Sequence, residues 1–143
     1  MTTDAPYGFE ILEHTADVGF RARGATAVEL FQHAADAFLF IACDRAEARE
    51  RETLPVVVDG DDLPSLLVNF LEEILFLFDA GRFATVRVSV DEITGSMVRA
   101  RLHGEPRDPA RHPWKLIVKA VTYHGLEVGE HAGRWEARVF MDV

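Results

Sequence analysis

The chain has 143 residues, of which 48% are hydrophobic, and its 24 acidic and 15 basic residues give a formal net charge of −9. This length and composition predict a single domain over residues 1–143 with an adequate hydrophobic core. An acidic field repels phosphate backbones, so direct nucleic-acid binding is not expected.

The cellular compartment is predicted from the absence of a signal peptide, a membrane helix and a cysteine pair. The first residues have neither the positive segment nor the apolar run of a signal peptide, and no apolar run approaches the length of a membrane helix. The single cysteine, Cys43, excludes an internal disulfide bond and is typical of a reducing compartment. We therefore expect a cytoplasmic protein without a membrane segment.

Two amphipathic helices are predicted in the first half of the chain. The first begins with a capping-box pattern, in which the Thr26 hydroxyl and the Glu29 carboxylate satisfy free backbone N–H groups. Its apolar residues recur at helical spacing to about Cys43. The second begins around residues 61–64, where two aspartates precede a proline, and ends near Asp79–Gly81.

The rest of the chain has the alternating pattern of strands, and Glu92 to Gly95 form a plausible hairpin turn. Strands clustered late, with two helices inserted early, indicate the α+β class. The predicted fold has two helices packed on one face of a mostly antiparallel sheet, in a single two-layer domain. The expected strands are Tyr7–Leu12, Val18–Arg23, Thr53–Val58, Val86–Val90, Val98–Leu102, Leu116–Tyr123 and Trp135–Asp142.

The last predicted strand runs to the end of the sequence, which is unusual because ordering a terminus costs conformational entropy. Alternation along this strand places Val143 on the apolar face, as a plug on the core side, and Asp142 on the polar face. Asp142 and Asp17 together offer oxygen ligands for a hard cation such as Ca²⁺ or Mg²⁺. The alternative is that Asp17 caps a turn and Asp142 is solvated.

Other polar residues are weaker candidates for the same chemistry. Glu105 and Asp108 lie in a turn-rich segment and could complete an acidic cluster, although aspartate and proline favour turns regardless of function. The six histidines lack the close pairs of a structural zinc site, which leaves only a catalytic zinc held by scattered histidines. No nucleophile elbow, phosphate-binding loop or dinucleotide fingerprint is present.

Several segments together resemble the archease family, in the family's order, from about Glu10 to Val143. The chain ends in Asp-Val where the family commonly has Asp-Ile, a mild departure because both residues are β-branched and apolar. The matching segments are His14-Thr15-Ala16-Asp17-Val18-Gly19, Leu66–Leu75, Gly104–Asp108, Lys119-Ala120-Val121-Thr122-Tyr123-His124 and Met141-Asp142-Val143.

The resemblance implies a non-catalytic accessory protein of the RtcB-type RNA ligase, which joins RNA ends in tRNA splicing and RNA repair. Such proteins promote the guanylylation of the ligase and its multiple turnover. The resemblance also implies a divalent cation, Ca²⁺, Mg²⁺ or Mn²⁺, near the C-terminus. Carried over to this chain, the site comprises Asp17, Asp142 and the terminal Val143, with Asp108 as a further ligand.

Two other functions remain open from the residues alone. One is a metal-independent chaperone, or a modulator of another RNA-modifying enzyme. The other is a metal-dependent hydrolase that uses the same carboxylates with His14 or His112 as the general base.

Overall fold

A computed structural model describes residues 8–14 and 17–143 of the chain. Tyr7, where the first predicted strand begins, and the Thr15-Ala16 part of the first family motif lie outside the described residues. In chain order the elements are β1 (Phe9–His14), β2 (Asp17–Gly24), α1 (Ala27–Ala42), β3 (Glu52–Asp59), α2 (Leu63–Asp79), β4 (Ala84–Ile93), β5 (Met97–Glu105), β6 (Ala120–Val121), β7 (Glu127–His131) and β8 (Arg134–Asp142).

Both helices begin where their capping residues predict. The Thr26 hydroxyl accepts the Glu29 N–H of α1, and the Glu29 carboxylate accepts the Ala25 N–H, each at 3.1 Å. At α2 the Asp62 carboxylate accepts the Ser65 N–H at 2.9 Å, and the Ser65 hydroxyl accepts the Asp62 N–H in return. These bonds satisfy N–H groups that the first turn of a helix leaves unpaired.

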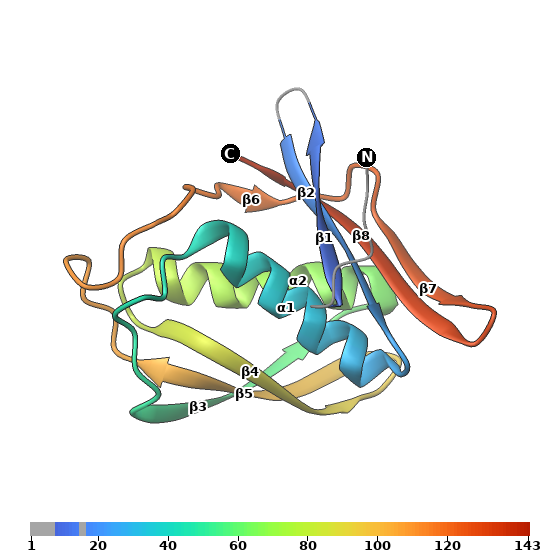
Figure 1. Cartoon of the computed structure of the whole chain (residues 1–143). Coiled ribbons are helices and arrows are strands. Elements are labelled where there is room, and N and C mark those ends of the chain that lie inside the picture. Colours follow the sequence, from blue (N-terminus) through green and yellow to red (C-terminus); the bar gives the residue numbers. More distant parts are fainter. Residues whose placement is uncertain (1–7, 15–16) are drawn as a thin grey trace.

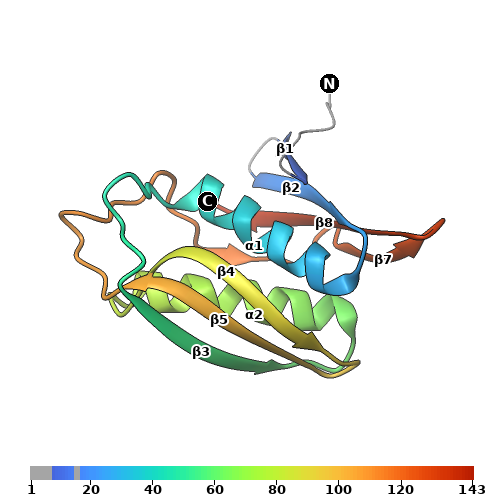
Figure 2. The same cartoon turned by 60° about the horizontal axis from the view of Figure 1, so that its bottom comes forward.

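The strands form two antiparallel sheets rather than one. The larger has the order β1-β2-β8-β6, with β7 also paired to β8, and the smaller has the order β3-β5-β4. Figures 1 and 2 show both helices enclosed between the two sheets, and each helix contacts strands of both. The α+β class, the two helices and the antiparallel pairing are confirmed, whereas the single sheet and the two-layer arrangement are corrected to three layers.

The width of the apolar surface on each helix explains the third layer. The buried residues of α1 and α2 extend well beyond a single stripe, so one sheet could not cover them. One core cluster contains Phe20 and Val139 of the larger sheet, Phe38 and Phe70 of the helices, and Leu102 of the smaller sheet. Among the described residues, neither helix is long and apolar enough to span a membrane.

Two strand predictions differ from the structure. The predicted strand Leu116–Tyr123 is reduced to β6, because the N–H groups of Lys115 and Leu116 bond to the Ala42 carbonyl at the end of α1. Strand β7 was not predicted; it joins β8 through a tight turn at Ala132 and Gly133, which have φ values of 53° and 76°. A two-residue hairpin turn with two positive φ values usually has the sequence Asn-Gly. Here the first turn residue is alanine, so the sequence does not indicate the turn.

Candidate metal centre

Asp17 and Asp142 lie directly opposite each other on neighbouring strands. Strands β2 and β8 are antiparallel, and their register pairs Asp17 with Asp142. Paired residues in an antiparallel sheet project to the same face, with Cβ atoms about 4.5–5.5 Å apart. The fold therefore brings together two acidic residues from opposite ends of the sequence, as the cation prediction requires.

Asp142 is held on both sides because β8 is an interior strand. Its backbone pairs with Asp17 of β2 on one side and with Ala120 of β6 on the other. The Asp142 carbonyl also accepts the Lys119 N–H at 2.8 Å. This pairing gives the final strand the order that a fixed ligand needs.

Val143 does not fill the core as alternation predicts. Its side chain is 37% exposed, because the last paired position of β8 is Asp142 and the register ends there. The outward direction of Asp142 is confirmed: Asp142 is exposed, whereas Val139 and Met141 on the other face are fully buried.

Two arginines on this face of the larger sheet are paired with acidic neighbours. Arg21 bonds Glu10 at 3.3 Å, and Arg23 bonds Glu136 at 3.1 Å. In the part of the chain that the structure describes, no ion pair involves Asp17 or Asp142. Like charges directly opposite each other destabilise a sheet, so this pair fits a hard cation that neutralises it.

Gly19, in the same motif as Asp17, allows an aromatic ring to lie next to the acidic pair. It is opposite Phe140, two positions along both strands and on the same face. A Cβ atom on Gly19 would lie 2.5 Å from Cδ1 of Phe140 and 2.6 Å from the Val139 carbonyl oxygen. The glycine is thus explained by close packing of the Phe140 ring over β2.

Asp108 lies in a loop, whereas Asp17 and Asp142 lie on paired strands. It is exposed in the loop after β5, where its carboxylate accepts the Ala110 N–H at 3.1 Å. Over residues 8–14 and 17–143, no group of three or more His, Cys, Asp or Glu side chains is arranged to hold a metal ion. The structure thus places Asp17 opposite Asp142, and Asp108 does not form a three-residue group with them.

Glu105 and His112 form a buried polar network. Glu105 is only 3% exposed, and its carboxylate bonds Arg111, the His112 ring and the Arg49 N–H at 2.9 Å each. The hydrogen bond from Arg111, with help from His112, lowers the pKa of Glu105 to about 2. The ionised Glu105 carboxylate therefore has a structural role, because its hydrogen bonds connect Arg111, His112 and the Arg49 backbone.

His112 has no ring nitrogen left for base catalysis. Its Nδ1 accepts the Asp108 N–H at 2.8 Å, so Nε2 carries the proton and donates to Glu105. This arrangement disfavours His112 as the general base of a hydrolase. The side chain of His14, the other candidate base, lies outside the described part of the chain.

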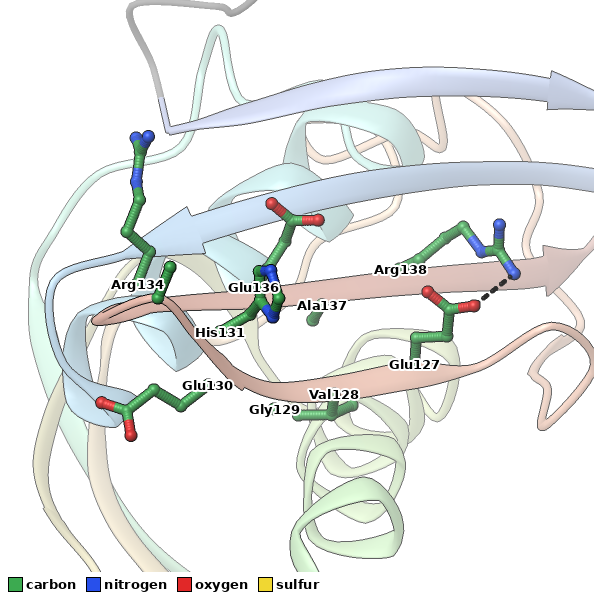
Figure 3. Close-up of a pocket in the computed structure, with 10 residues that line it drawn as sticks. Glu127, Val128, Gly129, Glu130, His131, Arg134, Glu136, Ala137 and Arg138 are labelled. Carbon is green, nitrogen blue, oxygen red and sulfur yellow. Dashed lines mark hydrogen bonds and ion pairs between the residues drawn. The ribbon is translucent and has the colours of Figure 1, made fainter.

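A groove of about 540 Å³ lies along the β7–β8 hairpin, lined by residues between Glu127 and Arg138. Figure 3 shows Arg138 and Glu127 as an ion pair at one end, with His131 and Arg134 toward the hairpin turn. Neither Asp17 nor Asp142 lines this groove. Asp142 is exposed on the outer face of the larger sheet.

The fold defines a small α+β protein whose helices are enclosed between two antiparallel sheets. The solution structure of protein 1598 from Methanobacterium thermoautotrophicum has this fold, with a TM-score of 0.73, 31% identity, and coverage of 96% of this chain and 99% of that one. A Thermotoga maritima protein described as an archease and possible chaperone has a TM-score of 0.63 at 16% identity, over 92% and 94% of the two chains.

The sequence comparisons identify the family. The model of the Archease protein family (MTH1598/TM1083) matches residues 9–143. The archease of Methanosarcina mazei is 37% identical over 94% of this chain and 95% of its own length. That of Pyrococcus furiosus is 35% identical over 94% and 98% of the two chains. The chain belongs to the archease family.

Proposed function

We propose that this protein is a non-catalytic accessory protein that binds a divalent cation and activates an RtcB-type RNA ligase. It would promote the guanylylation and multiple turnover of the ligase in tRNA splicing or RNA repair. Family membership supports the partner, and one structural observation carries the site: Asp17 and Asp142 oppose each other with no ion-pair partner among the described residues.

The donor set is suited to Ca²⁺, Mg²⁺ or Mn²⁺. Two carboxylates supply part of the oxygen shell that these cations need, and water or backbone oxygens complete such shells. The terminal Val143 adjoins Asp142. Asp108 forms no three-residue group with the pair among the described residues, so the proposed site rests on Asp17 and Asp142. A bound cation would neutralise phosphate charge near the nucleotide of the ligase. Asp17 and Asp142 would hold the cation from two strands of one sheet.

The charge of the protein supports an indirect role in RNA chemistry. A net charge of −9 disfavours contact with RNA but complements the basic surface of an RNA-binding enzyme. The protein would therefore dock beside the nucleotide site of the ligase rather than on its RNA.

Guanylylation of the ligase by GTP tests the proposal. Wild-type protein should increase the rate at which the ligase–GMP adduct forms, and Asp17→Asn and Asp142→Asn should each remove this increase. Glu52→Gln is a matched control, because Glu52 is an exposed acidic residue on β3 of the other sheet. Equal stimulation by wild type and both aspartate variants would exclude the site.

The same assay separates the competing functions. Partner binding that survives a chelator and both aspartate variants would indicate a metal-independent chaperone or a modulator of another RNA-modifying enzyme. Phosphoester turnover by the isolated protein, lost with a chelator, would indicate a hydrolase. The hydrogen bonds at both ring nitrogens of His112 weigh against the hydrolase.

A further inference from the structure

Helix side chains bond the backbone of several outer strands, but they leave most of the β3 edge uncovered. Gln32 of α1 bonds the backbone of β4 at 2.9 Å, and Glu72 of α2 bonds that of β6 at 3.1 Å. Strand β3 is an outer strand of the smaller sheet (Figures 1 and 2). Among the described residues, Asn69 is the one helix side chain that bonds the β3 backbone, at the Asp59 carbonyl and at 2.9 Å.

The Asp59 bond shows which backbone groups of β3 point away from β5. In an antiparallel pair, the N–H and C=O groups of alternate residues point away from the partner strand. The Gly60 N–H bonds the Ser96 carbonyl of the β4–β5 turn, and the Asp59 carbonyl bonds α2, as this alternation requires. No register shift interrupts the pairing of β3 with β5, so the groups of Val57 and Pro55 point outward as well. A proline at such a position costs no ladder bond. The Val57 N–H and the Val57 and Pro55 carbonyls are therefore placed to pair with an added strand.

A groove follows this edge, between β3 and α2. It consists of two hollows of about 450 and 370 Å³, which share Asp59 and Asn69. We call the two together the β3 groove. Because α2 contacts β3, a chain lying in the groove would have the strand edge on one side and the helix on the other. The walls include Val57, Asp59 and Asp61 in and after β3, and Asn69, Glu72 and Glu73 on α2.

The charge of the β3 groove selects its occupant. Four carboxylates line it, and no basic residue among those described does. In the described part of the chain, none of the four forms an ion pair. By contrast, Asp91 on the outer face of the same sheet pairs with Arg101 at 2.8 Å. The groove therefore complements a chain that carries positive charge.

We infer that the β3 groove binds an extended segment of a protein partner that is rich in lysine or arginine and adds to β3 as a further strand. This site is separate from the acidic pair, and the inference does not depend on the function proposed above. Backbone bonds to Val57 and Pro55 would hold the segment in register, and its alternate side chains would reach the carboxylates. Tyr123 is 60% exposed and lines one end of the groove, where its ring would contact a cation.

Other occupants fit the β3 groove less well. A second copy of this chain would bring two acidic grooves together, and like charges across an interface are unfavourable. RNA and an anionic lipid surface would be repelled by the same carboxylates. A metal ion lacks a ligand set, because no group of three or more acidic, His or Cys side chains among the described residues is arranged to hold one.

Peptide binding measured by fluorescence anisotropy tests the role of charge. The probe is a labelled peptide that alternates lysine with threonine, and its control has glutamate in place of lysine. We expect the full-length protein to bind the lysine peptide and not the glutamate peptide. The double variant Asp59→Asn/Glu73→Gln should raise the dissociation constant about tenfold. Glu52→Gln should leave it unchanged, because Glu52 is an exposed acid of the same strand that does not line the groove.

A second pair of variants tests the strand addition itself. Val57→Pro removes the N–H that would donate to the added strand, at a position where pairing with β5 does not use it. Val57→Thr keeps this N–H. We expect Val57→Pro to lose binding of the lysine peptide and Val57→Thr to keep the wild-type dissociation constant. In the wild-type protein, which needs no substitution, the lysine peptide should slow hydrogen exchange at the Val57 amide.

Several results would overturn the inference. They are no binding of the lysine peptide by wild type, equal binding by Val57→Pro and Val57→Thr, and an unchanged exchange rate at the Val57 amide. Equal weakening by Glu52→Gln and by the double variant would also overturn it, because the attraction would then be diffuse. A wild-type dimer in sedimentation that Val57→Pro dissociates would do the same, by showing that β3 pairs with a second copy of this chain.

Discussion

At the scale of single residues, the acidic pair is the feature that folding alone does not explain. Asp17 and Asp142 face each other without a cationic partner among the described residues, whereas other acids on the same face pair with arginines. A sheet gains nothing from two opposed carboxylates. In the function proposed above, a bound cation would remove this cost in stability.

The first prediction follows from this cost. In the presence of a chelator, Asp142→Asn should raise the free energy of unfolding by about 0.2–1 kcal/mol, because the like-charge contact is lost. In saturating Mn²⁺ the order should reverse, since wild type gains about 2.7 kcal/mol when the cation is at 100 times its dissociation constant. Urea denaturation under both conditions measures the two effects, and Glu52→Gln should show neither. Destabilisation by Asp142→Asn under chelation would contradict this account.

The second prediction concerns Glu105 and pH. Its pKa is lowered in the folded protein to about 2 from the ordinary value of 4.5. A lowered folded-state pKa means that the ionised form stabilises the fold above about pH 4.5 and that this stabilisation disappears as pH falls toward 2. Glu105→Gln should therefore be less stable than wild type at pH 7, and the difference should shrink steadily below pH 4.5. A difference that stays constant down to pH 2 would show that the carboxylate charge is not what matters.

At the scale of elements, side chains from the helices complete the hydrogen bonding of neighbouring strands. Gln32 of α1 accepts the Val90 N–H at 2.9 Å, where the β4–β5 register shifts, and Arg45 after α1 donates to the Val86 carbonyl at 3.0 Å. On α2, Glu72 accepts the Val121 N–H of β6 at 3.1 Å. These bonds tie each helix to strand backbone as well as to the apolar core.

The third prediction tests the start of α1. Thr26→Ala removes the hydroxyl that accepts the Glu29 N–H and should lower the free energy of unfolding by about 0.5–2 kcal/mol. Thr26→Ser keeps the hydroxyl and should cost much less. Because α1 begins at the far end of β2 from Asp17, cation affinity should be unchanged in both variants. Equal stability of the alanine and serine variants would show that the cap contributes little.

Local signals in the sequence predicted the elements well. Capping residues such as Thr26 and Asp62 and the alternation in β4, β5 and β8 depend on neighbours in the sequence, so both helices and most strands could be placed. The turn at Ala132 and Gly133 could not be predicted, because alanine rarely adopts a positive φ. The second sheet could not be predicted, because alternation gives each strand a buried face but does not say which strands share a sheet.

The candidate site was predictable only in part. The outward direction of Asp142 follows from alternation along β8, but its pairing with Asp17 depends on the register between strands at opposite ends of the sequence. The resemblance to a known family supplied that link. The hydrogen-bonded state of His112 could not be predicted, because its partners Glu105 and Asp108 are set by the path of a loop.

At the scale of the whole molecule, charge is distributed unevenly. Arginines on the outer faces of both sheets pair with acidic neighbours, among them Arg21 with Glu10 and Arg101 with Asp91. At the Asp142 end of β8, Asp17 and Asp142 oppose each other with no ion-pair partner among the described residues. The outer face of the larger sheet therefore carries one site whose chemistry differs from its surroundings.

Multiple-turnover RNA ligation tests the central claim most directly. The RtcB-type ligase, at a concentration far below that of RNA ends, would be assayed alone, with this protein, and with the Asp17→Asn or Asp142→Asn variant, in the presence of Mn²⁺ and GTP. The account predicts many ligation products per ligase molecule with wild-type protein, and no more with either variant than with the ligase alone. Equal product yield with wild type and both variants would contradict it.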